Sequence, residues 1–157
     1  MGNPTFITPN ATDSTSNIDA IFVEYSNVSA SIHIGNNTIR AVNDARYQFP
    51  SNQQIHRSGI ATKNTVGTYG GYWMDQIELG GDGPIVHRMD FIYQSNNSQG
   101  GDSGGPLYTI DEDNTLSICG ITSQHATLDD GTPITMFVAV EEIQYQLGVM
   151  PLTRSGT

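Results

Sequence analysis

Residues 100–108 have the composition of a turn that could carry a nucleophile. The stretch reads Gly100-Gly101-Asp102-Ser103-Gly104-Gly105-Pro106-Leu107-Tyr108, with a serine between glycines and an acid before it. Glycine permits backbone conformations that a side chain forbids, so the serine hydroxyl can be presented on a tight turn. The turn would also bring backbone N–H groups near an incoming carbonyl, where a developing oxyanion needs them. The pattern predicts nucleophilic chemistry at Ser103; the competing interpretation is a glycine-rich hairpin turn.

Residues 101–106 resemble the nucleophile motif of the chymotrypsin-fold serine proteases, and their surroundings are similar to the bacterial branch of streptogrisins and α-lytic protease. Three further segments are similar to this family, in the family's order. They are residues 17–23 (the segment of the triad aspartate), 55–59 with 67–71 (early strands of the second barrel) and 120–123 (the strand beside the specificity pocket). The resemblance implies an all-β, chymotrypsin-like Greek-key barrel. We expect a complete second barrel, the last strands of the first, and a short C-terminal helix.

The resemblance also implies roles for individual residues. Ser103 would attack the scissile carbonyl, the N–H groups of Gly101 and Ser103 would bind the oxyanion, and Asp19 would orient the catalytic imidazole. Asp102 would form a buried ion pair with Arg57, which stands in Arg57-Ser58-Gly59 as in the bacterial branch. Two alternatives stay open: Asp19 as an acid at a strand end, and Arg57 as a surface residue.

Substrate contacts are expected on two walls near Ser103. By resemblance, the residues concerned are Ser98, Gln99 and Gly100 on one wall and Thr122, Ser123, Gln124 and His125 on the other. Residues 95–99 contain no carboxylate, so a preference for cleavage after Lys or Arg is not expected. The sequence Ser123-Gln124-His125 departs from the family's Ser-Gly-Gly, which puts substrate-backbone pairing there in doubt.

A general base cannot be assigned within this chain. A serine hydroxyl is a weak nucleophile without a base in hydrogen-bond reach, and the family places its histidine upstream of the aspartate. The four histidines, His33, His56, His87 and His125, all follow Asp19. Three explanations fit: a fragment whose N-terminal half is missing, a partner chain that supplies the histidine, or an inactive protease-like binding domain. We favour the fragment, because the chain starts in the middle of the family's first barrel.

Composition limits the other function classes. The 157 residues carry a net charge of −10, which argues against nucleic-acid binding. No long apolar run predicts a membrane span, and no signal peptide is visible. No His/Cys spacing in the sequence fits a metal site, and no cofactor-binding motif is present. The expected binding partner is a peptide or protein substrate. Cys119 is predicted to be a buried core residue. The resemblance implies an extracellular protein.

Turn signals divide the chain into short strands. Residues 1–48 are interpreted as an N-terminal extension plus a remnant of the first barrel, and residues 49–157 as the second barrel. Residues 1–17 read as a loop or an unpaired extension. We expect a hairpin within residues 30–39 and a pair of strands at 72–79 and 85–93. The other expected strands are residues 18–25, 55–62, 107–110, 116–122 and 135–140. The expected helix is 141–147.

Overall fold

The computed structural model describes residues 20, 28–74, 88–94 and 98–154, together with the backbone of 5–7, 22–24, 77–78 and 85–86. The strands are β1 (Thr5–Ile7), β2 (Phe22–Glu24), β3 (Ser31–His33), β4 (Ile39–Ala41), β5 (Asp44–Ala45), β6 (Gln54–Gly59), β7 (Lys63–Trp73), β8 (Ile77–Glu78), β9 (Ile85–Val86), β10 (Met89–Tyr93), β11 (Pro106–Ile110), β12 (Leu116–Thr127) and β13 (Pro133–Ala139). The helix α1 spans Val140–Leu147. Within this part of the chain, no helix has the length and apolar character needed to cross a membrane.

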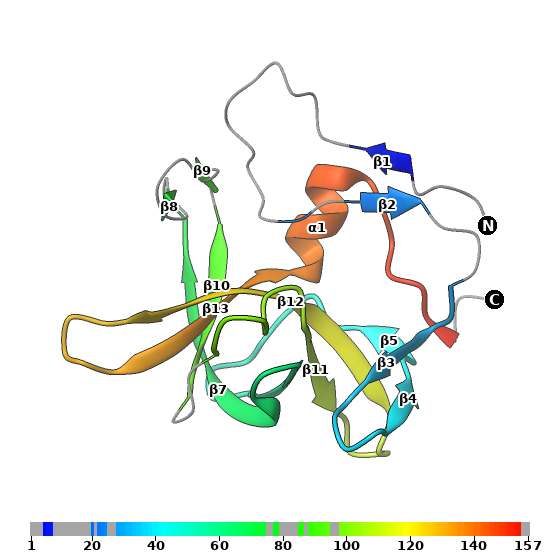
Figure 1. Cartoon of the computed structure of the whole chain (residues 1–157), viewed down its shortest axis with the longest axis horizontal. Coiled ribbons are helices and arrows are strands. Elements are labelled where there is room, and N and C mark those ends of the chain that lie inside the picture. Colours follow the sequence, from blue (N-terminus) through cyan, green and yellow to red (C-terminus); the bar gives the residue numbers. More distant parts are fainter. Residues whose placement is uncertain are drawn as a thin grey trace.

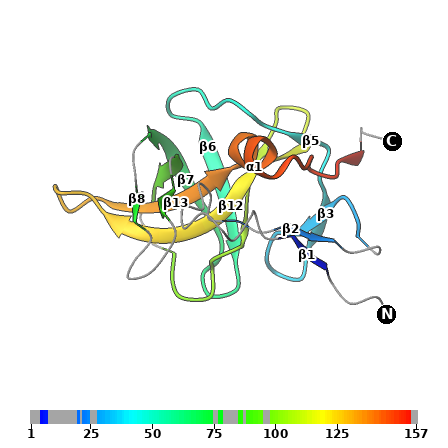
Figure 2. The same cartoon turned by 90° about the horizontal axis from the view of Figure 1, so that it is seen from above.

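The centre of the fold is a closed antiparallel barrel (Figure 1). Its strands follow the order β11-β6-β7-β10-β13-β12, and β12 pairs back with β11 to close it. Closure leaves no free edge within the barrel, which removes the main route to edge-to-edge aggregation. Beyond the barrel, β12 and β13 continue as a two-stranded arm (Figures 1 and 2). The all-β barrel with a short C-terminal helix agrees with the fold expected from the sequence.

The barrel interior is filled by aliphatic and aromatic side chains. Ile55, Ile92, Leu107, Cys119, Phe137 and Ala139 form one buried cluster, against which Phe49 and Tyr69 pack. Cys119 is fully buried, as predicted, and burial raises the pKa of its thiol to about 12. Because the thiolate is the reactive form, this cysteine is inert near neutral pH.

The helix is attached to the barrel by a charged contact as well as by apolar packing. Ile143 and Leu147 pack against the second core cluster, which includes Met136 and Val138. Arg88, just before β10, donates to Glu141 at 2.9 Å and to the buried Asp90 at 3.1 Å. The helix ends at Gly148 in the left-handed region, φ +65°, whose N–H donates to the Gln144 carbonyl. Arg88 therefore joins β10 of the barrel to the first turn of α1.

The hairpin expected within residues 30–39 is present as β3 and β4. Gly35, Asn36 and Asn37 all have positive φ at its turn, the conformation that glycine and asparagine tolerate best. After it, β5 adds to β12 in parallel, and the Arg46 N–H donates to the Ile118 carbonyl. The division of the chain at residue 48 stays a prediction.

Three expectations about element bounds need correction. Residues 1–17 are not all loop, because β1 pairs with β2; its Thr-Phe-Ile sequence favours a strand. β12 continues to Thr127 rather than ending at Thr122, since the arm pairs with β13. β7 runs without a break from Lys63 to Trp73, so it extends the strand expected at 67–71 in both directions and includes the start of the strand expected at 72–79, because β6 and β10 pair along it. In each case pairing with another strand decides where the element ends.

Gly120 on β12 pairs with Ala139 on β13 and packs closely against the β13 backbone. A Cβ at this position would lie 2.2 Å from the Val138 carbonyl oxygen, a backbone atom that cannot move without breaking the β12–β13 ladder. We predict that Gly120→Ala lowers the free energy of unfolding by about 1–3 kcal/mol, as overpacking in a core does. Urea denaturation measures this.

The matched control is Gly100→Ala, because a Cβ there meets no atom within 4 Å. We expect the control to change stability by less than about 0.5 kcal/mol. Equal effects of the two substitutions would contradict the close approach of the two strands.

Candidate active site

Ser103 is exposed on a turn of unusual backbone conformation. Gly101 before it has φ +100° and Gly104 after it has φ +79°, values that residues with a side chain rarely adopt. Gly105 packs closely: a Cβ there would lie 2.3 Å from the Ser58 carbonyl oxygen. The glycines thus serve two needs, positive φ on either side of Ser103 and close contact with β6.

The backbone N–H groups of the turn fall into two sets. Those of Asp102, Gly104 and Gly105 donate to the carbonyls of Gln99, Thr122 and Asp102 at 3.0, 2.8 and 3.0 Å. Within the described part of the chain, the N–H groups of Gly101 and Ser103 have no protein acceptor. Two amide donors beside an exposed hydroxyl are the chemical requirement for stabilising an oxyanion.

The structure brings Arg57 and Asp102 together as a buried ion pair. Arg57 Nη1 lies 2.8 Å from Asp102 Oδ2, and both side chains are 0% exposed. The Asp102 carboxylate also accepts hydrogen bonds from the N–H groups of Gln99 (3.0 Å), Ala61 (2.9 Å) and Thr62 (3.1 Å) and from the Thr62 hydroxyl (2.8 Å). Burial alone would raise the pKa of Asp102, but the bonds from Gln99, Thr62 and Arg57 hold that pKa well below its usual range.

The turn between β6 and β7 is therefore attached to the Ser103 turn through one carboxylate. Gly59 is part of this arrangement, since a Cβ there would lie 2.1 Å from Asp102 Oδ1. The sequence pointed to Arg57 and Asp102, but not to Ala61 and Thr62. The backbone donors of Ala61 and Thr62 leave no signature in residue type, and the Thr62 hydroxyl, which also donates to Asp102, stands in no motif that marks it.

The Ser103 hydroxyl donates a 2.9 Å hydrogen bond to the Ser123 carbonyl rather than to a histidine. Ser123 lies at a register shift between β12 and β13, where the strand bulges. Among the described histidines, His56 stacks on Tyr108 with ring centroids 5.3 Å apart, and burial lowers its pKa. His125 is exposed on the arm, opposite Thr135. His87 lies outside the described residues.

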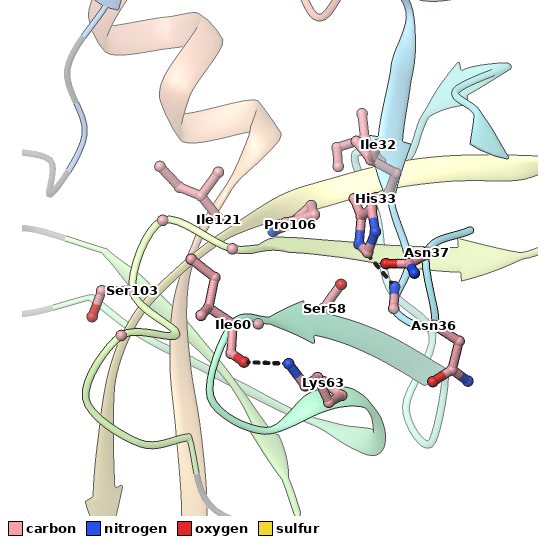
Figure 3. A pocket seen from close by; sticks show the side chains of 16 residues that line it. Ile32, His33, Asn36, Asn37, Ser58, Ile60, Lys63, Ser103, Pro106 and Ile121 are labelled. Atoms are coloured by element: carbon pink, nitrogen blue, oxygen red, sulfur yellow. Dashed lines mark hydrogen bonds between the residues drawn. The ribbon is translucent and has the colours of Figure 1, made fainter. Parts of the chain in front are cut away.

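A groove of about 800 Å³ leads away from Ser103 (Figure 3). Its walls include Ile32, Ile60, Pro106 and Ile121, and Ile60 is 81% exposed. His33 also lines this groove, but Figure 3 places it across the groove from Ser103, with Ile60 and Pro106 between them. His33 Nδ1 accepts the Gly35 N–H at 3.2 Å. The groove therefore starts at the candidate nucleophile and is largely apolar.

The other predicted site residues lie around the same turn. Gln99 and Gly100 are exposed, Ser98, Thr122 and Ser123 are buried, and Gln124 contacts Met136. Asp19 lies outside the described residues; its neighbour Ala20 packs against the cluster beneath α1. Sequence reasoning missed Gln94 and Thr135, two buried polar residues that hydrogen-bond each other at 2.9 Å. Among the described side chains, no group of three His, Cys, Asp or Glu has the arrangement of a metal site.

Comparisons with known proteins identify the architecture. No protein-family model matches the sequence, and comparison with curated proteins finds no relative. Solved structures do match: a chymotrypsin of Cellulomonas bogoriensis superposes with a TM-score of 0.70 and 22% identity, over 96% of this chain and 75% of that one. The chain has the chymotrypsin fold. The resemblance found in the sequence is thus confirmed for the fold.

Two further solved structures with the chymotrypsin fold also superpose on this chain at low sequence identity. Thermobifida fusca Protease A matches with a TM-score of 0.66 and 20% identity, over 85% of this chain and 67% of that protein. A glutamic-acid-specific serine protease, which uses a histidine triad in substrate binding, matches with a TM-score of 0.64 and 26% identity, over 83% of this chain. This chain spans 65% of that protease's length. Both neighbours are proteases and both are longer than this chain.

The Asp102 carboxylate should make folding pH-dependent. Because its folded pKa is depressed, its stabilisation is fully present above the unfolded value of about 3.9 and is lost as pH falls toward the folded pKa. We predict that Asp102→Asn, which leaves Arg57 buried without its partner, lowers the free energy of unfolding at pH 7 by about 3–5 kcal/mol. The difference in the free energy of unfolding between wild type and variant should become smaller below about pH 4. Urea titrations from pH 2 to pH 8 measure it.

The control is Asp129→Asn, at an exposed position in the turn of the arm. The free energy of unfolding of this variant should stay close to the wild-type value across the pH range. A gap for Asp102→Asn that is small, or that stays constant down to pH 2, would contradict a buried, ionised carboxylate.

Proposed function

We propose that this chain is the nucleophile-bearing part of a serine endopeptidase that acts on peptide or protein substrates outside the cell. Ser103 Oγ attacks the scissile carbonyl and forms an acyl-enzyme, while the Gly101 and Ser103 N–H groups stabilise the tetrahedral oxyanion. The observation that carries this proposal is the exposed hydroxyl beside two amides without protein acceptors, on a turn anchored by a buried carboxylate.

The reaction needs a group that takes the hydroxyl proton and returns it to the leaving amine. In the present state that proton is directed at the Ser123 carbonyl, which is not a base at neutral pH. We propose that a histidine on polypeptide outside this chain, an upstream half, supplies the imidazole, and that Asp19 orients it. Supporting this, none of the described histidines hydrogen-bonds Ser103.

The groove is the proposed place of contact for that polypeptide. It opens beside Ser103, so a segment packed there would reach the hydroxyl. Ile60 projects into it with 81% of its surface exposed, which is costly for an apolar side chain in water. The fold neighbours also have additional chain, since this one covers 67% and 75% of two of them.

A fluorophosphonate probe tests the nucleophile directly, because activated serine oxygen displaces its fluoride and forms a stable adduct. A positioned base contributes about 10²–10⁴-fold to such reactions. We predict slow labelling and no measurable peptide hydrolysis by the chain alone. Added imidazole at pH 8 should raise the labelling rate at Ser103 about tenfold or more. Peptide mapping by mass spectrometry locates the adduct.

Ser103→Ala should abolish this labelling, while the control Ser29→Ala, at another exposed serine, should leave it unchanged. Labelling spread over several serines, or unaffected by Ser103→Ala, would contradict the proposal. Absence of any imidazole-dependent labelling would favour the catalytically inactive binding domain instead.

A further inference from the structure

A second cleft lies apart from the groove that begins at Ser103. It holds about 580 Å³, within the range of about 300–1,000 Å³ that is usual for small-ligand sites. The described residues that line it include none of those that line the Ser103 groove. Its walls come from the segment before β6, from β7, from the residue before β10 and from the first turn of α1. We define this aromatic cleft by six of its lining residues: Tyr47, Phe49, Tyr69, Tyr72, Arg88 and Glu141.

The aromatic wall is held in place by the barrel behind it. The Phe49 ring packs on Tyr69, with ring centroids 4.9 Å apart, and meets the core residue Phe137 edge-on at 5.9 Å. The Tyr69 hydroxyl donates to the buried Asp90 carboxylate at 2.8 Å. Because these contacts use only groups of the protein, the wall is formed before a ligand arrives, which reduces the entropy cost of binding.

Two carboxylates share one guanidinium at the cleft. Arg88 donates to Asp90 through Nε at 3.1 Å and through Nη2 at 3.4 Å, and to Glu141 through Nη1 at 2.9 Å. Asp90 is fully buried, and the hydrogen bonds from Arg88 and Tyr69 oppose the rise in its pKa that burial causes. The Glu141 side chain is 48% exposed. With both carboxylates ionised, the cleft has one negative charge in excess, and Glu141 presents that charge to solvent.

The groups that remain for a ligand are a carboxylate oxygen and tyrosine side chains. Glu141 Oε1 and the hydroxyls of Tyr47 and Tyr72 have no hydrogen-bond partner among the described residues. The Tyr72 ring already attracts a cation, since the central carbon of the Arg88 guanidinium lies 4.7 Å from the ring centroid. Aromatic rings beside a carboxylate form the combination that attracts organic cations.

Other classes of ligand match this cleft less well. An anion would be repelled by the excess charge of the cleft and by the net charge of −10 on the whole chain. A purely apolar ligand would cover Glu141 and the tyrosine hydroxyls without giving them hydrogen bonds, and their desolvation would oppose binding. A neutral sugar would give those hydrogen bonds but would gain nothing from the excess charge. A cation gains from the charge and from the rings.

We propose that the aromatic cleft is a binding site for an organic cation, with an alkylammonium group lying between the tyrosine rings and Glu141. Two sources present this chemistry: a free small molecule with a quaternary ammonium group, and a lysine side chain of another protein. The proposal does not depend on the proposed function, because the cleft and the Ser103 groove have no described lining residue in common.

NMR titration of the full chain tests the choice of charge. Choline is compared at constant ionic strength with dimethylbutanol, in which a carbon atom replaces the charged nitrogen, and with glucose. Choline should bind about tenfold more tightly than either neutral compound, because only choline interacts with the excess charge and the ring faces. The amide signals of Gly71, Tyr72 and Glu141 should shift, while those of Gly101 and Ser103 should not.

The source of the cation is tested in the same titration with a lysine that is blocked at both ends. Tighter binding of the blocked lysine would assign the cleft to a protein partner, and tighter binding of choline would assign it to a free ligand. Either result supports a cation site, provided that the bound compound is preferred over dimethylbutanol.

Glu141→Gln removes the excess charge at nearly constant size and should weaken choline binding about tenfold, while leaving dimethylbutanol binding unchanged. The matched control is Glu142→Gln, which removes the same charge one residue later. The Glu142 carboxylate accepts from Gln146 along the helix and does not line the cleft, so this variant should change choline binding less than about twofold.

Tyr72→Leu keeps Glu141 and removes an exposed ring, so it tests the proposal even if the loss of the Arg88–Glu141 contact disturbs α1. It should also weaken choline binding severalfold. Equal affinities for choline and dimethylbutanol would overturn the proposal, and so would tighter binding of glucose. Equal weakening by Glu141→Gln and Glu142→Gln would contradict it too, because the effect would then come from net charge alone.

Discussion

The Asp102 carboxylate is the contact on which the geometry of this molecule depends. It joins three segments that are distant in sequence: Arg57 on β6, the turn that follows β6, and the loop that carries Ser103. A carboxylate taken out of water is stable only when its oxygens are fully hydrogen-bonded and its charge is neutralised. Asp102 meets both conditions, so the exposed Ser103 beside it is held by an anchor that solvent does not reach.

The barrel explains why this anchor can form. β6 and β11 are adjacent, with Leu107 opposite Arg57, so the loop before β11 arrives beside the arginine. β12 then fixes the same loop from the other side through the Thr122 backbone. The nucleophile turn is thus held by hydrogen bonds between two strands of a closed sheet, and the N–H groups of Gly101 and Ser103 belong to this turn. The proposed enzyme has its nucleophile and its oxyanion donors on one turn, and its base is proposed to come from another polypeptide.

Local chemistry was predictable from the sequence, whereas strand partnership was not. The Ser103 turn and the Gly35-Asn36-Asn37 hairpin depend on glycine and asparagine at particular backbone angles, which residue type reveals. The Arg57–Asp102 pair followed from a family resemblance. The ends of β7 and β12, and the meeting of Ser98 with Thr135, depend on registers between distant strands, which no local pattern specifies. The role of Asp19 in orienting the catalytic imidazole stays a prediction.

Amide hydrogen exchange measured by NMR, with wild type compared to Asp102→Asn, tests the anchoring role of Asp102 most directly. The N–H groups of Gln99, Ala61 and Thr62 all donate to its carboxylate. We predict that all three are protected from exchange in the wild type and lose protection together in the variant, while the β10–β13 ladder stays protected. Fast exchange of these amides in the wild type, or unchanged protection in the variant, would contradict the account.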